Sequence, residues 1–193
     1  MAITINGSGT VTGLSVGGIS NTKAVATAAM PAGSVLQVKS TTKTDSTTQS
    51  LASDSWWNYT DASLRATITP IAANSIILLS AQIYFGEGSG QWYQFKFMKD
   101  GSTDITDVIG DAASDRNRVT AMMDKSTHDD NARPINLQAV TTAGDTNERY
   151  YNIAFNHTSG LTRTLSLNQC ANDIDNFEYA RGVSTITAME IAV

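Results

Sequence analysis

Apolar and polar residues alternate along much of this 193-residue chain. From Leu64 to Thr69 every second side chain is apolar, which is the period of a half-buried β-strand. Pro70 ends this stretch because proline has no N–H for a strand ladder. The following run from Ile76 to Phe85 is apolar on both faces, lacks Pro and Gly, and is too short to cross a membrane as a helix. This run predicts the central strand of a two-layer β-domain.

Several other stretches show the same alternation. The predicted strands begin at Val35 and include these apolar positions: Tyr93, Phe95, Phe97, Ile135, Leu137, Ala139, Tyr151, Ile153, Phe155, Leu165 and Leu167. Residues 40–55, rich in Thr and Ser, predict a strand end and a long loop, and Asp100-Gly101 predicts a tight hairpin turn. Val183 to Val193 predicts a closing strand. Short strands with turn signals about every ten residues predict an all-β fold, an antiparallel β-sandwich or jelly roll.

The first 22 residues differ from the rest of the chain. Small residues, including five glycines, separate these larger apolar ones: Ile3, Ile5, Val11, Leu14, Val16 and Ile19. Such a segment buries too little surface to fold alone, so we expect it to add to another sheet or to pack on copies of itself. A floppy chain end is the alternative interpretation. The predicted division is an extended N-terminal docking segment at residues 1–33 and a β-domain at residues 34–193.

Composition excludes several classes of partner. Charged residues make up 16% of the chain, the net charge is −5, and the 13 Lys and Arg residues are scattered. Nucleic acid is therefore not an expected partner, because phosphate binding needs clustered basic residues. The single cysteine, Cys170, is expected to be buried in a protein that folds in a reducing cytosol. The sequence shows no signal peptide and no apolar run of about 18 residues, so neither export nor membrane insertion is expected.

The motifs for metal binding and catalysis are weak. Asn172 to Asn176 carries alternating oxygen ligands suited to calcium, but the glycine and distant glutamate of an EF-hand are missing, and a solvated loop is favoured. His128, Asp129 and Asp130 supply too few metal ligands unless the fold brings His157 near. With two histidines and no Gly-x-Ser-x-Gly motif, we predict no enzyme activity, no catalytic residue, no cofactor and no metal.

Aromatic residues near loops are the strongest binding candidates. Trp56, Trp57, Tyr59 and Trp92 could stack on a sugar ring while nearby Asn and Asp side chains bind its hydroxyls. The alternative is that they belong to the sandwich core, which is favoured for Trp92 and equally weighted for Trp56 and Trp57. The sequence leaves both interpretations open.

Four segments, taken in order, resemble the C-terminal jelly-roll domain of bacteriophage tail fibres, especially those of marine and cyanobacterial phages. They are Ala32–Val38 with the Thr/Ser-rich stretch after it, Leu64–Pro70 with the apolar strand after it, Phe97–Gly101, and Gly182–Ile191. Ile3–Gly7 with Gly13–Gly18 is similar to the virion-proximal start of many such fibres. Residues 112–134 match nothing recognisable, and only about ten residues, instead of a long shaft, separate this start from the domain.

The resemblance implies a virion structural protein that assembles in the host cytoplasm. It would be a short homotrimeric tail fibre, attached to other virion proteins of the tail or baseplate through its N-terminal segment, with a domain that binds a receptor such as a host surface glycan. A capsid decoration or head-fibre protein is the alternative. A polysaccharide depolymerase is disfavoured because such enzymes are usually longer β-helical chains and no solenoid repeat is present.

The closing strand is apolar on both faces. This pattern fits a strand that is internal to a sheet or packed on a symmetry axis. The predicted trimer contacts are Ile186, Met189, Ile191 and Val193. Glu190 lies in the same strand and needs a hydrogen-bond partner if it is buried.

Overall fold

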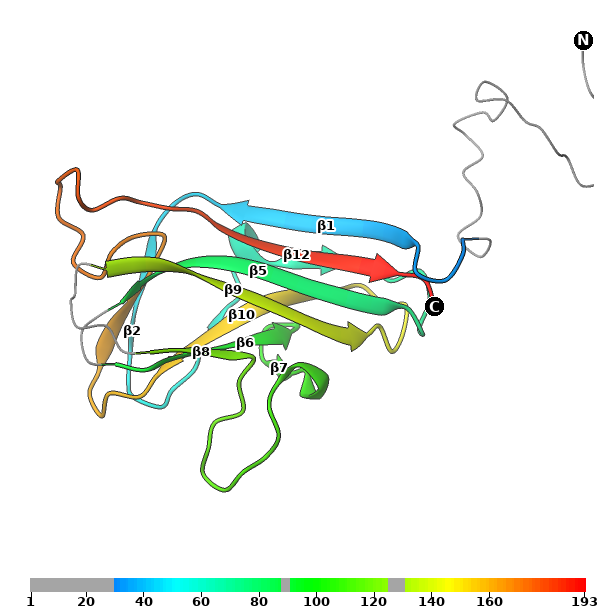
Figure 1. Cartoon of the computed structure of the whole chain (residues 1–193), viewed down its shortest axis with the longest axis horizontal. Coiled ribbons are helices and arrows are strands. Elements are labelled where there is room, and N and C mark those ends of the chain that lie inside the picture. The colour runs from blue at the N-terminus through cyan, green and yellow to red at the C-terminus, as the bar shows by residue number, and fades with distance from the viewer. Residues whose placement is uncertain (1–29, 88–90, 125–130) are drawn as a thin grey trace, which may run out of the picture.

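The computed structural model describes residues 30–87, 91–124 and 131–193 and shows two antiparallel β-sheets packed on each other (Figure 1). Sheet I contains β1 (Val35–Lys43), β2 (Thr47–Leu51), β5 (Ile76–Glu87), β9 (Asn131–Thr142), β11 (Arg163–Leu167) and β12 (Ser184–Ile191). Sheet II contains β3 (Trp57–Tyr59), β4 (Ala66–Ile68), β6 (Tyr93–Lys99), β7 (Thr103–Asp104), β8 (Ala121–Met123) and β10 (Arg149–His157). Helical structure in the described part is limited to two 3₁₀ turns, η2 (Ala62–Leu64) and η3 (Thr106–Val108). The all-β prediction is confirmed.

Strand β5 is central in sheet I, as predicted from its two apolar faces. Strand β9 pairs along one edge of β5, and β12 and β11 share the other edge. Strand β1 pairs with β12, and β2 pairs with β11. In sheet II, β10 is central, with β3 and β4 on one edge and β6 on the other, and β6 pairs onward with β7 and β8.

The core lies between the sheets and follows the alternation of the sequence. Every second residue of β5 from Ile77 to Phe85 is buried, and the predicted apolar positions of β6 and β10 are buried with them. Phe85 of sheet I stacks on Phe155 of sheet II with ring centroids 5.7 Å apart, and it meets Phe95 edge-on at 5.3 Å. Aromatic pairs in these geometries add to the hydrophobic gain of burial.

One expectation about local structure is wrong. The Thr/Ser-rich residues 40–55 were expected to form a strand end and a long loop, yet they contain the end of β1 and all of β2. Strand β2 has no buried residue, so it lacks the apolar alternation that predicts strands. It forms because β-branched threonines favour extended backbone and because β11 pairs with it over five residues.

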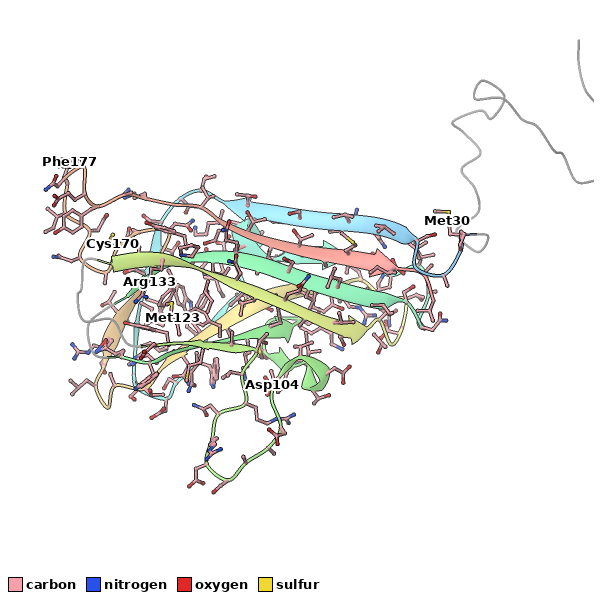
Figure 2. The ribbon with its side chains drawn as sticks, in the orientation of Figure 1. Met30, Asp104, Met123, Arg133, Cys170 and Phe177 are labelled. Atoms are coloured by element: carbon pink, nitrogen blue, oxygen red, sulfur yellow. The ribbon has the colours of Figure 1, made fainter. Side chains whose placement is uncertain are left out.

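The two ends of the sandwich differ. Met30 and the end of β12 lie at one end of the long axis, and Cys170 and Phe177 lie at the other (Figure 2). Asn168, fully buried at φ 63°, ties the second end together. Its Nδ2 donates to the backbone carbonyls of Lys43 and Asp45, both at 2.9 Å, and its Oδ1 accepts from Ser184 Oγ at 2.6 Å. One amide thereby connects β1, the β1–β2 turn, the end of β11 and β12.

Candidate functional site

The four candidate aromatic residues separate into two groups. Trp57 and Tyr59 lie on the inner side of β3, where their rings meet edge-on with centroids 5.3 Å apart and Trp57 also contacts Phe155. Trp56 lies on the outer side of sheet II, where the centroid of its ring is 4.2 Å from Lys96 Nζ. Trp92 precedes β6 and is 39% exposed, so it is not part of the core that the sequence favoured for it.

Trp57 and Tyr59 line a cleft between the two sheets. The cleft has a volume of about 270 Å³ and opens where β2, at the edge of sheet I, lies opposite β3, at the edge of sheet II. We call it the β2–β3 cleft. Its lining residues are Lys43, Asp45, Thr47, Gln49, Trp57, Asn58, Tyr59, Thr60 and Asp61. Two of the four candidate aromatics therefore share one cavity with carboxylate, amide and hydroxyl groups.

Lys43 is the least expected residue of this cleft, because its side chain is 1% exposed. Its Nζ lies 2.7 Å from Asp45 Oδ2 and 5.7 Å from the centroid of the Tyr59 ring. Burial works to lower the pKa of Lys43, but its interactions with Asp45 and Tyr59 outweigh burial and raise the pKa above its ordinary value. The ammonium is therefore charged at neutral pH and orients the Asp45 carboxylate.

The two carboxylates of the cleft are also held in their charged form. The hydrogen bond from Lys43 lowers the pKa of Asp45, whose side chain is 72% exposed. Asp61 accepts a hydrogen bond from the Ser63 backbone N–H at 2.7 Å as the N-cap of η2, and this bond lowers the pKa of Asp61. At neutral pH the cleft contains one buried cation and two anions at its rim.

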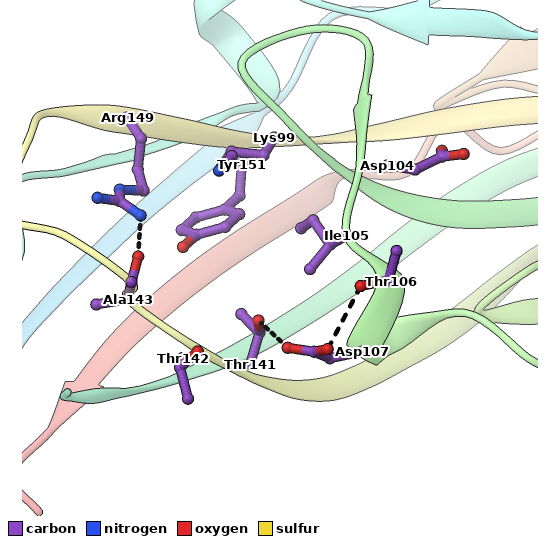
Figure 3. Close-up of a pocket in the computed structure, with 11 residues that line it drawn as sticks. Lys99, Asp104, Ile105, Thr106, Asp107, Thr141, Thr142, Ala143, Arg149 and Tyr151 are labelled. Carbon is purple, nitrogen blue, oxygen red and sulfur yellow. Dashed lines mark hydrogen bonds between the residues drawn. The ribbon is translucent and has the colours of Figure 1, made fainter. Parts of the chain in front are cut away.

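A second cleft, of about 200 Å³, lies beside Arg149 (Figure 3). The Arg149 guanidinium donates to the Ala143 and Asp145 carbonyls and pairs with the Asp145 carboxylate. These interactions stabilise the turn between β9 and β10. Asp107 accepts a hydrogen bond from Thr141 Oγ1 at 3.0 Å. The polar groups of this cleft are mostly paired with each other, which leaves fewer of them for a ligand.

The weak metal motifs do not converge in the described residues. Asp173 of the Asn172–Asn176 run forms a salt bridge with Arg181 at 2.5 Å, so its carboxylate already has a positively charged partner. His157 is fully buried, with its Nε2 2.9 Å from the Leu51 carbonyl oxygen. His128, Asp129 and Asp130 lie outside the described residues. Within the ranges that the structure describes, no three His, Cys, Asp or Glu side chains are placed to share a metal ion.

The predicted trimer contacts occupy different sides of sheet I. Met189 and Ile191 are half-buried on the outer face, and Val193 is 66% exposed. Ile186 is fully buried between the sheets, so in this structure it cannot contact a partner across the outer face. The correction follows from alternation, because Ile186 is an odd number of residues from Met189 and Ile191. The predicted docking residues Ile3 to Ile19 all lie outside the described residues.

Met189 and Ile191 belong to a larger outer surface, to which the described residues of β1, β5, β9 and β12 contribute no charged side chain. The register of β1, β5, β9 and β12 places these residues on it: Val35, Val38, Ser40, Thr42, Ile76, Leu78, Ser80, Gln82, Tyr84, Pro134, Asn136, Gln138, Val140, Thr142, Thr185, Thr187, Met189 and Ile191. We call this surface the charge-free face. The lysines of β1 and Glu190 of β12 alternate onto the inner side.

An apolar row crosses the whole charge-free face. Val38 lies opposite Met189, Met189 opposite Leu78, and Leu78 opposite Val140. The row at its two edges is open to solvent, since Val38 is 50% and Val140 53% exposed. From the sequence, only residues of the closing strand were predicted to form a contact surface. The second apolar side of the run from Ile76 to Phe85 was the signal that could have added β5 to this surface.

Glu190 has the partners that its burial requires. Its Oε1 accepts from the Ile71 backbone N–H at 2.7 Å, and its Oε2 accepts from Gln37 Nε2 at 2.6 Å. Burial works to raise the pKa of Glu190, but these hydrogen bonds outweigh it and lower the pKa below the ordinary value of 4.5. The Glu190 carboxylate is therefore charged at neutral pH and is stabilised by hydrogen bonds from within the same chain.

No protein-family model matches this chain, and no curated protein matches it significantly. In the part of the chain that the structure describes, no helix has both the length and the apolar character that crossing a membrane requires.

Proposed function

We propose that this chain is a non-enzymatic phage virion protein, a short trimeric tail fibre whose residues 1–33 dock on the tail or baseplate. Its β-domain presents a receptor-binding surface to the host. The observation that carries the proposal is the charge-free face, with its apolar row across β1, β12, β5 and β9. A structural subunit of a particle needs such a surface to bind its own copies.

The composition of the face supports self-association. The cores of protein interfaces are depleted in charged residues, whereas the exposed surface of a monomer is rich in them. The chain has 31 charged residues (13 Lys and Arg plus 18 Asp and Glu), and none is on the outer side of these four strands. An apolar row with exposed ends, Val38 at 50% and Val140 at 53%, is the kind of surface that an interaction site offers. We assign it to the contact between subunits, with Met189 and Ile191 at one end.

The order of the strands supports the proposed jelly-roll topology. One sheet contains β1, β12, β5 and β9 in adjacent positions, and the other contains β3 and β4, then β10, β6, and finally β7 and β8. The first and last described strands are therefore neighbours, and the chain crosses from one sheet to the other after β2, β4, β5, β8, β9 and β10. Repeated crossings of this kind are typical of a jelly roll built from two Greek keys.

The polarity of the molecule supports the fibre assignment. The described chain begins at Met30, at the end of the sandwich where β12 also ends (Figure 2). A docking segment preceding Met30 would therefore attach the domain by this end. The connection between β11 and β12, with Phe177 92% exposed, would point away from the particle.

Two measurements on the full chain test the proposal. Light scattering of the purified protein is expected to give three times the mass of the chain, and a peptide label after Val193 is expected on tails of intact particles. A monomer at micromolar concentration would refute the assembly role of the charge-free face. Label over the capsid would replace the fibre assignment by a decoration protein.

A further inference from the structure

We propose that the β2–β3 cleft binds one ring of a neutral saccharide. Its role as the receptor site rests on the proposed function above, but the binding itself does not, because it depends only on the groups that line the cleft. The cleft combines an aromatic wall with carboxylate, amide and hydroxyl groups from three consecutive segments of the chain.

The aromatic wall is rigid. Trp57 is held by edge-on contact with Tyr59 and by a tilted contact with Phe155, both with ring centroids 5.3 Å apart. The Tyr59 hydroxyl lies 3.2 Å from Ser63 Oγ, which fixes the second ring. Trp57 is half-buried, whereas Tyr59 is buried at 5% exposure and supports it from behind. A half-buried aromatic side chain offers apolar area at little conformational cost, and this suits the C–H face of a sugar ring.

The polar groups around this wall are mainly acceptors. Asp45 and Asp61 each carry a carboxylate with unfilled lone pairs, and the Gln49 side chain contributes an amide oxygen. Gln49 Nε2 donates one of its two N–H groups to the neighbouring Ser50 carbonyl, so the amide oxygen and one N–H remain for a ligand. Thr47 and Thr60 add hydroxyls that can donate or accept. A ligand that satisfies this set must bring several O–H donors.

Charge narrows the ligand class further. Two ionised carboxylates at the rim disfavour an anionic ligand such as a uronic acid or a phosphate. The place that a cationic ligand would take, against Tyr59 and beside Asp45, is already filled by the Lys43 ammonium. An uncharged, hydroxyl-rich ligand remains.

The size of the cleft limits how much of the ligand enters. At about 270 Å³ it falls just below the range usual for small-molecule pockets, so it accommodates one ring while the remainder of a chain stays outside. An open site with few contacts predicts weak binding, with a dissociation constant of about a millimolar for one ring.

Strand β2 offers a matched pair of variants for the test. Thr47 and Gln49 line the cleft, whereas Thr48 lies between them on the other side of the strand and is exposed. Thr47→Glu would put a third carboxylate into the cleft, and Thr48→Glu would add the same charge outside it. The probes are the methyl glycosides of glucose, mannose, galactose and N-acetylglucosamine, with glucuronic acid as the charged comparison, measured by saturation-transfer NMR on the full chain.

At least one neutral glycoside is expected to bind and to quench Trp fluorescence, and glucuronic acid is expected to bind less. Thr47→Glu should weaken that binding by about tenfold or more, while Thr48→Glu leaves it unchanged. Absence of binding by every neutral glycoside, or equal loss in the two variants, would overturn the proposal. Light scattering of the same samples reports assembly separately, so failure of the saccharide site and failure of the fibre assignment remain distinguishable.

Discussion

The outer faces of the two sheets are built in opposite ways. On sheet II, polar and charged groups are mostly paired within the protomer: Lys96 with Asp104 at 2.6 Å, and Gln94 with Asn117 at 2.9 Å. Asn152, fully buried, exchanges hydrogen bonds with the backbone of Gly101. Asn156 is an exception, because it is 1% exposed and neither of its amide atoms has a partner among the described residues. On sheet I, the outer face has no charge and leaves its apolar row open.

The difference indicates which surface the protomer completes by itself. Burial on the outer side of sheet II is achieved by the chain, through Trp56 over Lys96 and the turn at Gly101 over Tyr150. On the charge-free face, Val35, Val38 and Val140 remain about half exposed. Under the proposed assembly, the half-exposed apolar row of sheet I would gain free energy by contact with a partner, whereas most polar groups outside sheet II are already paired within the chain.

The largest expected effect comes from placing a charge in the apolar row. Leu78→Asp would bury an unpaired carboxylate between subunits at a cost of about 4 kcal/mol, roughly a thousandfold in association. The variant is expected to be a folded monomer by light scattering and circular dichroism. The matched control is Thr67→Asp, which adds the same charge to an exposed position of sheet II and is expected to keep the parent mass. A Leu78→Asp protein with the same oligomeric mass as the parent would contradict the assignment of the charge-free face to a contact between subunits.

The second largest effect concerns the charge that sheet I keeps on its inner side. Glu190→Ala leaves the Ile71 N–H without its acceptor and removes one of the two hydrogen bonds of Gln37 Nε2, so it should lower the free energy of unfolding by about 3 kcal/mol. Urea denaturation in the Leu78→Asp background measures this without a contribution from subunit dissociation. Thr187→Ala, on the outer side of the same strand, should cost less than about 0.5 kcal/mol there.

The same carboxylate predicts a pH dependence. Because the pKa of Glu190 is lowered in the folded protein, its stabilisation is complete above the ordinary value of 4.5 and is lost as the pH falls through the lower folded value. Glu190→Gln removes this titration, so the stability difference between parent and variant should shrink on acidification below pH 4.5. A difference that stays constant from neutral to acidic pH would contradict the assignment.

A smaller effect is expected from the internal pairing of sheet II. Asn152→Ala removes both hydrogen bonds to Gly101 and leaves two backbone groups without a partner, at a cost of about 2 kcal/mol. Chemical denaturation measures the loss. The oligomeric mass should not change, because the residue acts within one protomer. Dissociation without a loss of protomer stability would place an interface on sheet II instead.

The smallest effect concerns the ion pair of sheet II. Lys96→Met keeps the apolar stem under Trp56 and removes only the ammonium. The Lys96 side chain is 10% exposed and that of Asp104 is 49% exposed, so solvent reaches the pair from the carboxylate side. Such a pair is expected to contribute about 0.5 to 1 kcal/mol, and less in high salt. Thermal unfolding at low and high salt is expected to show a difference between parent and variant that is largest at low salt. A loss comparable to that of Glu190→Ala would mean that the pair is more structural than its exposure suggests.

The strands that carry the core could be predicted from the sequence, because a buried face imposes a period of two. This held for the run from Ile76 to Phe85 and for the aromatic positions of β6 and β10. Strand β2 could not be predicted, because no side chain of β2 is buried and its stability comes from pairing with β11. The burial of Cys170 was predicted correctly, at 3% exposure.

The candidate site was predicted only in part. Trp57 and Tyr59 were identified by type, but Lys43, Asp45 and Gln49, which complete the β2–β3 cleft, were not, because they lie in the run interpreted as a loop. Ile186 was grouped with Met189 and Ile191 although alternation separates them. The first error concerns which residues from distant segments share one surface, whereas the second contradicts the alternation within a single strand.

By itself, the sequence determined the fold class, the central position of β5 and the need of Glu190 for partners, because alternation, turn residues and the cost of a buried charge are local properties. Only the tertiary structure decided how these strands are ordered. That order aligns Val38, Met189, Leu78 and Val140 in one row and sets β2 opposite β3. Strand register in this row depends on pairing between residues 62 to 151 positions apart, and no local pattern encodes which partner is chosen.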